Sequence, residues 1–377
     1  MDSREKNEYE KKLKRLEKEA RADDVRFKIR QQVRRREIEM GSKAPAIVRE
    51  VSEVLEIAGM HIVHKTYENP IWQGFKRSDD SINEGVLKRK ESQKIRKDME
   101  EELRCYAEKY PNAKKEDKEA IAELEQIKKK YAEVLSRRED NVKRQVDELR
   151  DVINANWKHW SHFITLTFKE NLVDIELARS RFKDWTKKMC ALYDDFIYCY
   201  VIEFQERGAV HFHVIVRIKN GKRVGKTEFM KIRNTWNFGS INIKGIAQKY
   251  KKEVPKKIKD ATNEELKLEE VEDDVKIVYV WSLGNYLTGY MKKEAGNVLL
   301  FGQKMFGTSA KEKLEKKIVI RDKKIIDRAV GELELDRLKK KEYVIEQKET
   351  ENTITMSYYN KLIIEDDVKT PKDTKNK

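Results

Sequence analysis

The sequence predicts an α+β fold, in which a central antiparallel β-sheet carries flanking helices and follows a charged, mostly helical N-terminal region. Three segments rich in β-branched and aromatic residues indicate strands: 161–168, 196–205 and 209–218. Apolar residues recur at helical spacing in 174–193, 226–236 and 281–293. Only three residues join the second and third strands, and so short a connection permits only an antiparallel pair. Hairpins interspersed with helices are typical of helices packed on an antiparallel sheet.

The predicted order of elements is strand, helix, strand, strand, helix, strand, helix. The fourth strand covers 239–246, and the charged stretch 249–275 indicates a solvated insertion. The composition around this order predicts three consecutive regions: a charged helical region over 1–150, the sheet-containing domain over 151–312, and a charged C-terminal tail over 313–377.

The N-terminal region is predicted mainly from its composition. Residues 1–40 contain no glycine or proline and are dense in lysine, arginine and glutamate, which indicates a long solvated helix or a partly disordered basic arm. Residues 44–60 predict a short amphipathic helix that ends near Gly59, and 67–80 predict a loop. Residues 86–152 are helical in composition, with one break at a proline.

Charge narrows the class of partner. The chain has 377 residues, 40% of them charged, and a formal net charge of +15. This balance favours nucleic acid first and an anionic membrane surface second, while lysine-rich solvated helices without such a partner are the alternative. The sequence contains neither a run of about 18 apolar residues for a membrane span nor an apolar segment for a secretory signal near its start. Three separated cysteines without a CxxC pair favour a reducing, cytoplasmic location.

The segment "ERGAVHFHVIV" places two histidines one residue apart in a strand. If residues 206–208 form a three-residue loop with a left-handed glycine, Glu203 lies directly opposite His211. His213 then shares their sheet face, because side chains alternate along a strand. Two imidazoles and a carboxylate predict a site for a divalent metal, Mg²⁺ or Mn²⁺. A two-residue loop would instead turn Glu203 to the other face, and histidines with purely structural roles are common.

"NYLTGYMKK" places Tyr286 and Tyr290 four residues apart, on one face of a helix, directly before Lys292 and Lys293. Aromatic residues at this spacing also occur simply as core packing. A tyrosine oxygen is a weak nucleophile at neutral pH, but a divalent metal can polarise a phosphodiester as a Lewis acid. The metal ligands, the paired tyrosines and the basic charge together indicate DNA cleavage through a phosphotyrosine.

These segments resemble the HUH endonucleases, in particular the two-tyrosine rolling-circle replication initiators of plasmids and phages. "FITLTF", "EFQERGAVHFHVIV" and "YLTGYMKK" are similar to the three motifs of that family and occur in the family's order. "TWNFGSINIKGI" and "LLFGQKMFGTSA" also resemble stretches found around those motifs. The resemblance covers about residues 155–312.

The resemblance implies that His211 and His213 are metal ligands and that Tyr286 and Tyr290 are nucleophiles. It implies an antiparallel sheet that carries the metal centrally, with the tyrosine helix beside it. One position departs from the family, because Gly289 stands where a lysine often precedes the second tyrosine. Its role near the phosphate is then expected of Lys292 or Lys293, and Arg207 in the hairpin loop is a further expected DNA contact.

The sequence therefore predicts a rolling-circle replication initiator that nicks and rejoins single-stranded origin DNA through a covalent 5′-phosphotyrosine. The alternatives are a relaxase or transposase with the same chemistry, and a non-catalytic DNA-binding protein. "GKRVGKT" (221–227) has three residues between its glycines where a phosphate loop has four, so strand opening is expected of a separate host helicase. Four further histidines are expected to be structural: His61, His64, His159 and His162.

Overall fold

A computed structural model describes most of the chain. The described residues are 3–43, 45–74, 79–110, 118–170, 172, 174–205, 209–218, 226–247, 277–279, 283–294, 300, 303–347 and 351–364. The chain forms two compact units. The first unit combines Met1–Asp79 with Lys316–Lys377, and the second unit is Asp80–Glu315. In the part of the chain that the structure describes, no helix is both long and apolar enough to cross a membrane.

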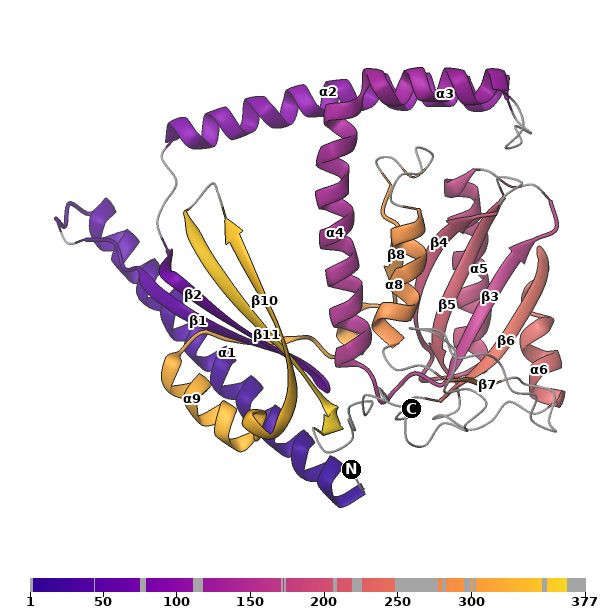
Figure 1. The fold of residues 1–377 in the computed structure, drawn as a ribbon. Coiled ribbons are helices and arrows are strands. Elements are labelled where there is room, and N and C mark those ends of the chain that lie inside the picture. Colours follow the sequence, from indigo (N-terminus) through magenta and orange to yellow (C-terminus); the bar gives the residue numbers. More distant parts are fainter. Residues whose placement is uncertain are drawn as a thin grey trace, which may run out of the picture. The chain divides into compact units, whose positions relative to one another are not determined.

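The second unit is built on a six-stranded sheet (Figure 1). Its strands are β3 (His162–Phe168), β4 (Ile197–Phe204), β5 (Val210–Arg217), β6 (Gly239–Ala247), β7 (Ile277–Tyr279) and β8 (Phe306–Thr308). Their order is β7-β6-β3-β5-β4-β8, and every pair is antiparallel except β6 with β7. The predicted α+β class with a central, largely antiparallel sheet is confirmed.

One face of this sheet is apolar and is covered by a helix. α5 (Ile175–Leu192) begins at Asp174, whose side chain accepts hydrogen bonds from two backbone N–H groups of its first turn. Its buried Phe182 ring lies 4.7 Å from that of Phe212 on β5, centroid to centroid. α6 (Lys226–Arg233) leads toward Thr235, which accepts a hydrogen bond from Trp185 of α5. The alternation of β5 therefore turns Phe212 into this core and both neighbouring histidines to the opposite face.

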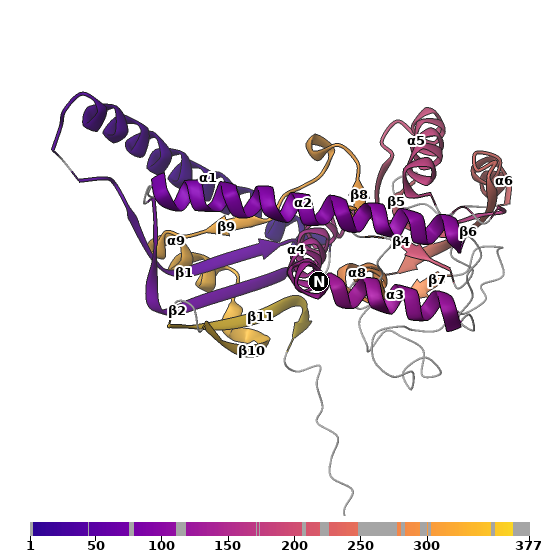
Figure 2. The same cartoon turned by 90° about the horizontal axis from the view of Figure 1, so that it is seen from above.

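The opposite face of the sheet meets α8 (Leu283–Lys293), which packs against α4 (Ala132–Ala155). Figure 2 shows α5 and α6 on one side of the sheet and α8 on the other. The contact between the two helices is close at Gly284, where an added Cβ atom would lie 2.6 Å from Oδ1 of Asn154. Two further helices precede α4, namely α2 (Asp79–Lys109) and α3 (Lys118–Lys130). A 3-10 turn, η3 (Lys311–Lys313), follows β8.

The first unit contains a five-stranded sheet with the order β10-β11-β2-β1-β9. Its strands are β1 (Arg49–Ala58), β2 (His61–Gln73), β9 (Ile318–Ile320), β10 (Leu338–Gln347) and β11 (Asn352–Ile364). α1 (Ser3–Glu39) and α9 (Lys323–Glu332) contact strands β9 and β1 respectively, and η4 (Leu335–Arg337) leads into β10. Its buried residues include Leu16, Leu55, Ile57, Ile62 and Ile326.

The predicted helix over 44–60 and the predicted loop over 67–80 are wrong, because these residues contribute β1 and most of β2. Gly59 does not end a helix. It has a φ of +59° and lies in the two-residue turn between Ala58 and His61, which pair across the hairpin. A glycine with positive φ suits a helix end and a hairpin turn equally, so its presence could not distinguish them.

The C-terminal segment expected as a tail contains β9, α9, β10 and β11 and belongs to the first unit. Pairing of β9 with β1, and of β11 with β2, joins segments more than 250 residues apart in the sequence. The compact units thus combine segments that the sequence placed in separate regions. The expected charged insertion 249–275 and residues 219–225 of the rejected phosphate loop lie outside the described residues.

Candidate functional site

The β4–β5 hairpin has the register expected from its sequence. Glu203 pairs directly with His211, and Gln205 donates its backbone N–H to the carbonyl oxygen of Ala209 at 2.9 Å. The loop residues 206–208, which include the expected DNA contact Arg207, lie outside the described residues. The three-residue connection therefore places Glu203 on the same sheet face as the two histidines.

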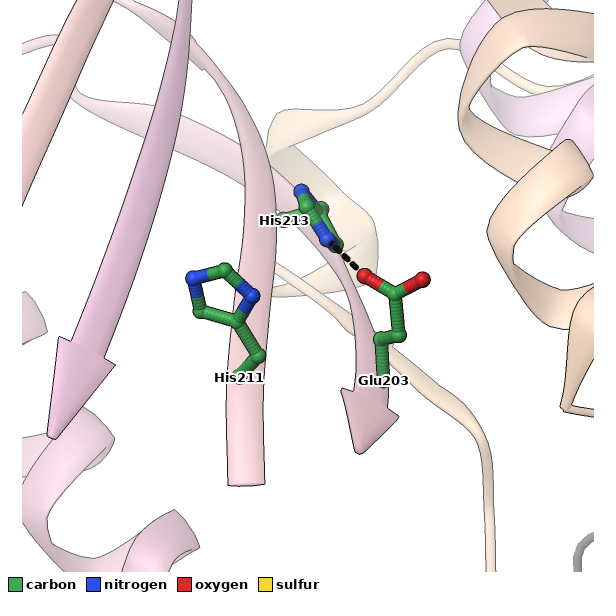
Figure 3. Close-up of side chains that lie close together, drawn as sticks. All are labelled: Glu203, His211 and His213. Atoms are coloured by element: carbon green, nitrogen blue, oxygen red, sulfur yellow. Dashed lines mark hydrogen bonds and ion pairs between the residues drawn. The ribbon is translucent and has the colours of Figure 1, made fainter. Parts of the chain in front are cut away.

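Glu203, His211 and His213 form a compact group that we call the acid–histidine cluster (Figure 3). One potential ligand atom from each residue lies within 4.8 Å of the others. Nε2 of His213 lies 2.5 Å from Oε2 of Glu203, and the two imidazole centroids are 4.9 Å apart. His213 is buried, whereas Glu203 and His211 are half-buried, so the cluster remains open to solvent on one side.

The cluster keeps its carboxyl group ionised. Burial alone would raise the pKa of Glu203, but the hydrogen bond and the charge of His213 lower it. The charges of Lys293 and His211 lower it further, and the net result is a pKa below the ordinary value. Glu203 is therefore a carboxylate at neutral pH, the form that binds a cation.

This donor set fits a divalent metal ion. Two imidazole nitrogens and one carboxylate oxygen, with positions left open, are typical of catalytic rather than closed structural sites. Two ligands about 2.1 Å from one octahedral ion at a right angle are about 3 Å apart. A small separation of Glu203 and His213 would therefore admit an ion between them.

The two tyrosines of α8 face the cluster. The ring of Tyr290 stacks on that of His213, with centroids 3.7 Å apart and planes 19° apart. The ring of Tyr286 meets the edge of Phe163 on β3 at 5.2 Å. The two tyrosine hydroxyl oxygens are 3.3 Å apart. Helical spacing thus brings two phenol groups to one side of the proposed metal position, while Leu287 and Met291 bury the other side of α8.

The basic residues after Tyr290 are exposed. Nζ of Lys293 lies 5.0 Å from the centroid of the Tyr290 ring, and Lys292 is also exposed. An atom added at Gly289 would meet nothing within 4 Å. The surface around the tyrosines therefore has room for a phosphate chain, with at least one ammonium group beside it.

The other histidines have partners of their own. Nδ1 of His162 lies 2.9 Å from the Ser161 hydroxyl in the core, and burial lowers the pKa of this histidine to about 4. His159 lies 3.5 Å from Glu315. His64 is paired with Glu53 at 2.9 Å in the first unit, where His61 also lies on β2. Among the described residues the acid–histidine cluster is the only group of three or more such side chains that could hold a metal ion.

Two neighbours of the cluster had no role assigned from the sequence. Phe163 contacts His213 and both tyrosines, and Oγ1 of Thr167 lies 2.6 Å from Nε2 of His211. Both residues lie on β3, which pairs with β5. Alternation along "FITLTF" puts Phe163 and Thr167 on one face, but only the strand pairing shows that this face carries the histidines.

Comparison with known proteins gives one match. Residues 161–260 match the model of a family described as replication-associated protein ORF2. This segment contains the acid–histidine cluster, whereas the tyrosines of α8 lie beyond it. Neither the curated proteins nor the solved structures contain a significant match. The matched segment is similar to a replication-associated protein and supports a role for this chain in the initiation of DNA replication.

Proposed function

We propose that the chain initiates rolling-circle replication by nicking and rejoining single-stranded origin DNA through a covalent 5′-phosphotyrosine. The observation that carries this proposal is the position of Tyr286 and Tyr290 over the acid–histidine cluster, with Tyr290 stacked on a proposed metal ligand. A structural role for either group alone would not require the two to meet. The match to a replication-associated family supports the same interpretation.

Glu203, His211 and His213 would hold a Mg²⁺ or Mn²⁺ ion, and two nitrogen donors favour the transition metal. Such an ion, when bound, acts as a Lewis acid on the scissile phosphate. The phenol oxygen of one tyrosine attacks phosphorus and forms an O–P bond, while the bond from phosphorus to the 3′ oxygen breaks. The phenol loses its proton and the released 3′ oxygen gains one, so the step is balanced without an added reactant.

The linkage to tyrosine conserves the energy of the phosphodiester, so attack by a free 3′ hydroxyl can rejoin the strand. A second tyrosine allows a second cut while the first still carries DNA. The 3.3 Å between the two hydroxyl oxygens places both within reach of one phosphate position. Family resemblance assigns the first attack to Tyr286 and the second to Tyr290.

DNA contacts are proposed for Lys292, Lys293 and Arg207, beside the tyrosines and in the hairpin loop. Single-stranded DNA carries one phosphate per nucleotide, and exposed ammonium groups beside the cluster attract it. Unwinding of the duplex is proposed to come from a separate host helicase.

The test is to incubate the full chain with a pool of single-stranded oligonucleotides and Mn²⁺ and to look for a protein band whose shift survives denaturant. We expect an adduct with the wild type and none with the Tyr286→Phe, Tyr290→Phe double variant. Tyr343→Phe is the matched control, because Tyr343 is an exposed tyrosine on β10, outside the cluster. A denaturant-resistant adduct in the double variant, or none in the wild type, would leave a non-catalytic DNA-binding protein as the better description.

A further inference from the structure

Thr167 lies beside the acid–histidine cluster but is neither a charged group nor a proposed metal ligand. It pairs with His211 across β3 and β5, and its Oγ1 atom lies 2.6 Å from Nε2 of that ring. The hydroxyl is half-buried, so its hydrogen bond is partly shielded from water. The short contact fixes which nitrogen of His211 is directed at β3.

The other ring nitrogen of His211 points toward Glu203 and His213 (Figure 3). A neutral imidazole carries one proton, and the nitrogen that binds a metal must be the unprotonated one. If Nε2 carries the proton and donates it to Oγ1 of Thr167, Nδ1 keeps its lone pair for the ion. Partners of this kind, which hold the outer nitrogen of a metal-binding histidine, set both ring orientation and ligand strength.

We propose that Thr167 is a positioning residue that holds His211 in the Nε2–H tautomer and turns its Nδ1 atom into the cluster. The proposal rests on the metal site of the proposed function and adds a partner that orients one ligand of that site. His213 is oriented differently, because Glu203 bonds to its ring and Tyr290 stacks on it. The two histidines would thus present different nitrogens, Nδ1 of His211 and Nε2 of His213.

Thr165 provides a matched comparison. It lies two residues earlier on β3, is also half-buried and pairs with His213 in the way that Thr167 pairs with His211. Among the described residues, the structure shows a hydrogen bond to a histidine ring for Thr167 but not for Thr165. Valine has the shape of threonine without its hydroxyl and favours strands, so Thr→Val at either position tests the hydroxyl alone.

The first measurement is the affinity of the full chain for Mn²⁺, by calorimetry or by electron paramagnetic resonance of free Mn²⁺. We expect Thr167→Val to weaken binding about 10- to 100-fold, the usual effect of losing such a partner. Thr167→Ser, which keeps the hydroxyl, should restore affinity to within a few-fold of wild type, and Thr165→Val should bind as the wild type does. Equal Mn²⁺ affinity of Thr167→Val and wild type, with both chains folded by circular dichroism, overturns the proposal.

The second measurement is the tautomer of His211 in metal-free protein, from the nitrogen chemical shifts of its ring. We expect mainly the Nε2–H form in the wild type and in Thr167→Ser, and a mixture in Thr167→Val. If the wild type binds no Mn²⁺, the metal of the proposed function is wrong, and the tautomer comparison alone decides the role of Thr167. The same tautomer in wild type and Thr167→Val would then refute it.

Discussion

The ring of Tyr290 lies nearly flat against that of His213, with centroids 3.7 Å apart. A proposed nucleophile and a proposed metal ligand are therefore one packing unit, and a change in one ring displaces the other. Phenylalanine at position 290 keeps this stack, whereas alanine removes it. Substitutions at Tyr290 can thus separate the chemistry of the hydroxyl from the support of the site.

We expect Tyr286→Phe to reduce the initial covalent adduct sharply, at least about 100-fold, because the hydroxyl assigned to the first attack is lost. Tyr290→Phe should still nick and form the adduct but should fail to terminate replication cleanly. Mass spectrometry of the trapped adduct locates the modified residue. DNA attached to neither tyrosine would make both rings core aromatics.

Removal of one imidazole from the cluster should abolish cleavage without abolishing DNA binding, because basic residues elsewhere carry most of the affinity. His211→Ala is the direct variant, measured for cleavage in Mn²⁺ and for binding by fluorescence anisotropy. His64→Ala is the control, since His64 pairs with Glu53 in the first unit. Cleavage by chelator-treated His211→Ala protein would contradict the metal site.

The two glycines of α8 should respond in opposite directions to alanine. At Gly284 the new Cβ atom would lie 2.6 Å from Oδ1 of Asn154 and 2.9 Å from Cγ of Arg150, so we expect a loss of about 1–3 kcal/mol of stability from overpacking. At Gly289 nothing lies within 4 Å, and alanine in a helix interior should stabilise by about 0.5–1 kcal/mol. Chemical denaturation measures both, and shifts of the same sign would show that α8 does not pack on α4 in this way.

Stability of the second unit should fall in mild acid because of His162. Burial lowers the pKa of this histidine to about 4, whereas the unfolded chain has the ordinary value near 6.5. Between these values the unfolded state binds one more proton than the folded state, so stability is lost as pH falls from about 6.5 to about 4. The loss is at most about 3 kcal/mol. His162→Phe should flatten this dependence in denaturation series at different pH, and an unchanged slope would assign it to other groups.

The basic helix α1 is expected to bind the DNA backbone without taking part in chemistry. Deletion of residues 1–150 is an unsuitable test, because it removes most of α4, which packs on α8. Lys28, Arg30 and Arg35 are exposed on α1, and alanine keeps the helix. We expect the triple alanine variant to lose affinity for single-stranded DNA and to lower the salt slope by roughly 2. Gln32→Ala is the uncharged control, and an unchanged slope in the triple variant would make α1 a solvated face only.

Local rules predicted the part of the site that depends on one hairpin. Loop length and alternation together placed Glu203 opposite His211, because both act within fewer than ten residues. The contact between Thr167 and His211 spans 44 positions and depends on the pairing of β3 with β5, which no local pattern specifies. The strand β1 was missed for a related reason. Its sequence suits a helix as well as a strand, and only its partners β2 and β9 make it a strand.

The non-contiguous first unit has a consequence for the order in which the chain folds on the ribosome. β1 and β2 are synthesised early, but β9 and β11, which cover their outer edges, follow only after Glu315. At about 5–20 residues per second, the intervening unit takes roughly 10–50 s to synthesise. During that interval the nascent hairpin presents two unpaired edges, a form that invites aggregation or chaperone binding. The unit that carries the acid–histidine cluster can therefore be complete before the unit whose segments flank it in the sequence, and its assembly does not wait for the end of translation.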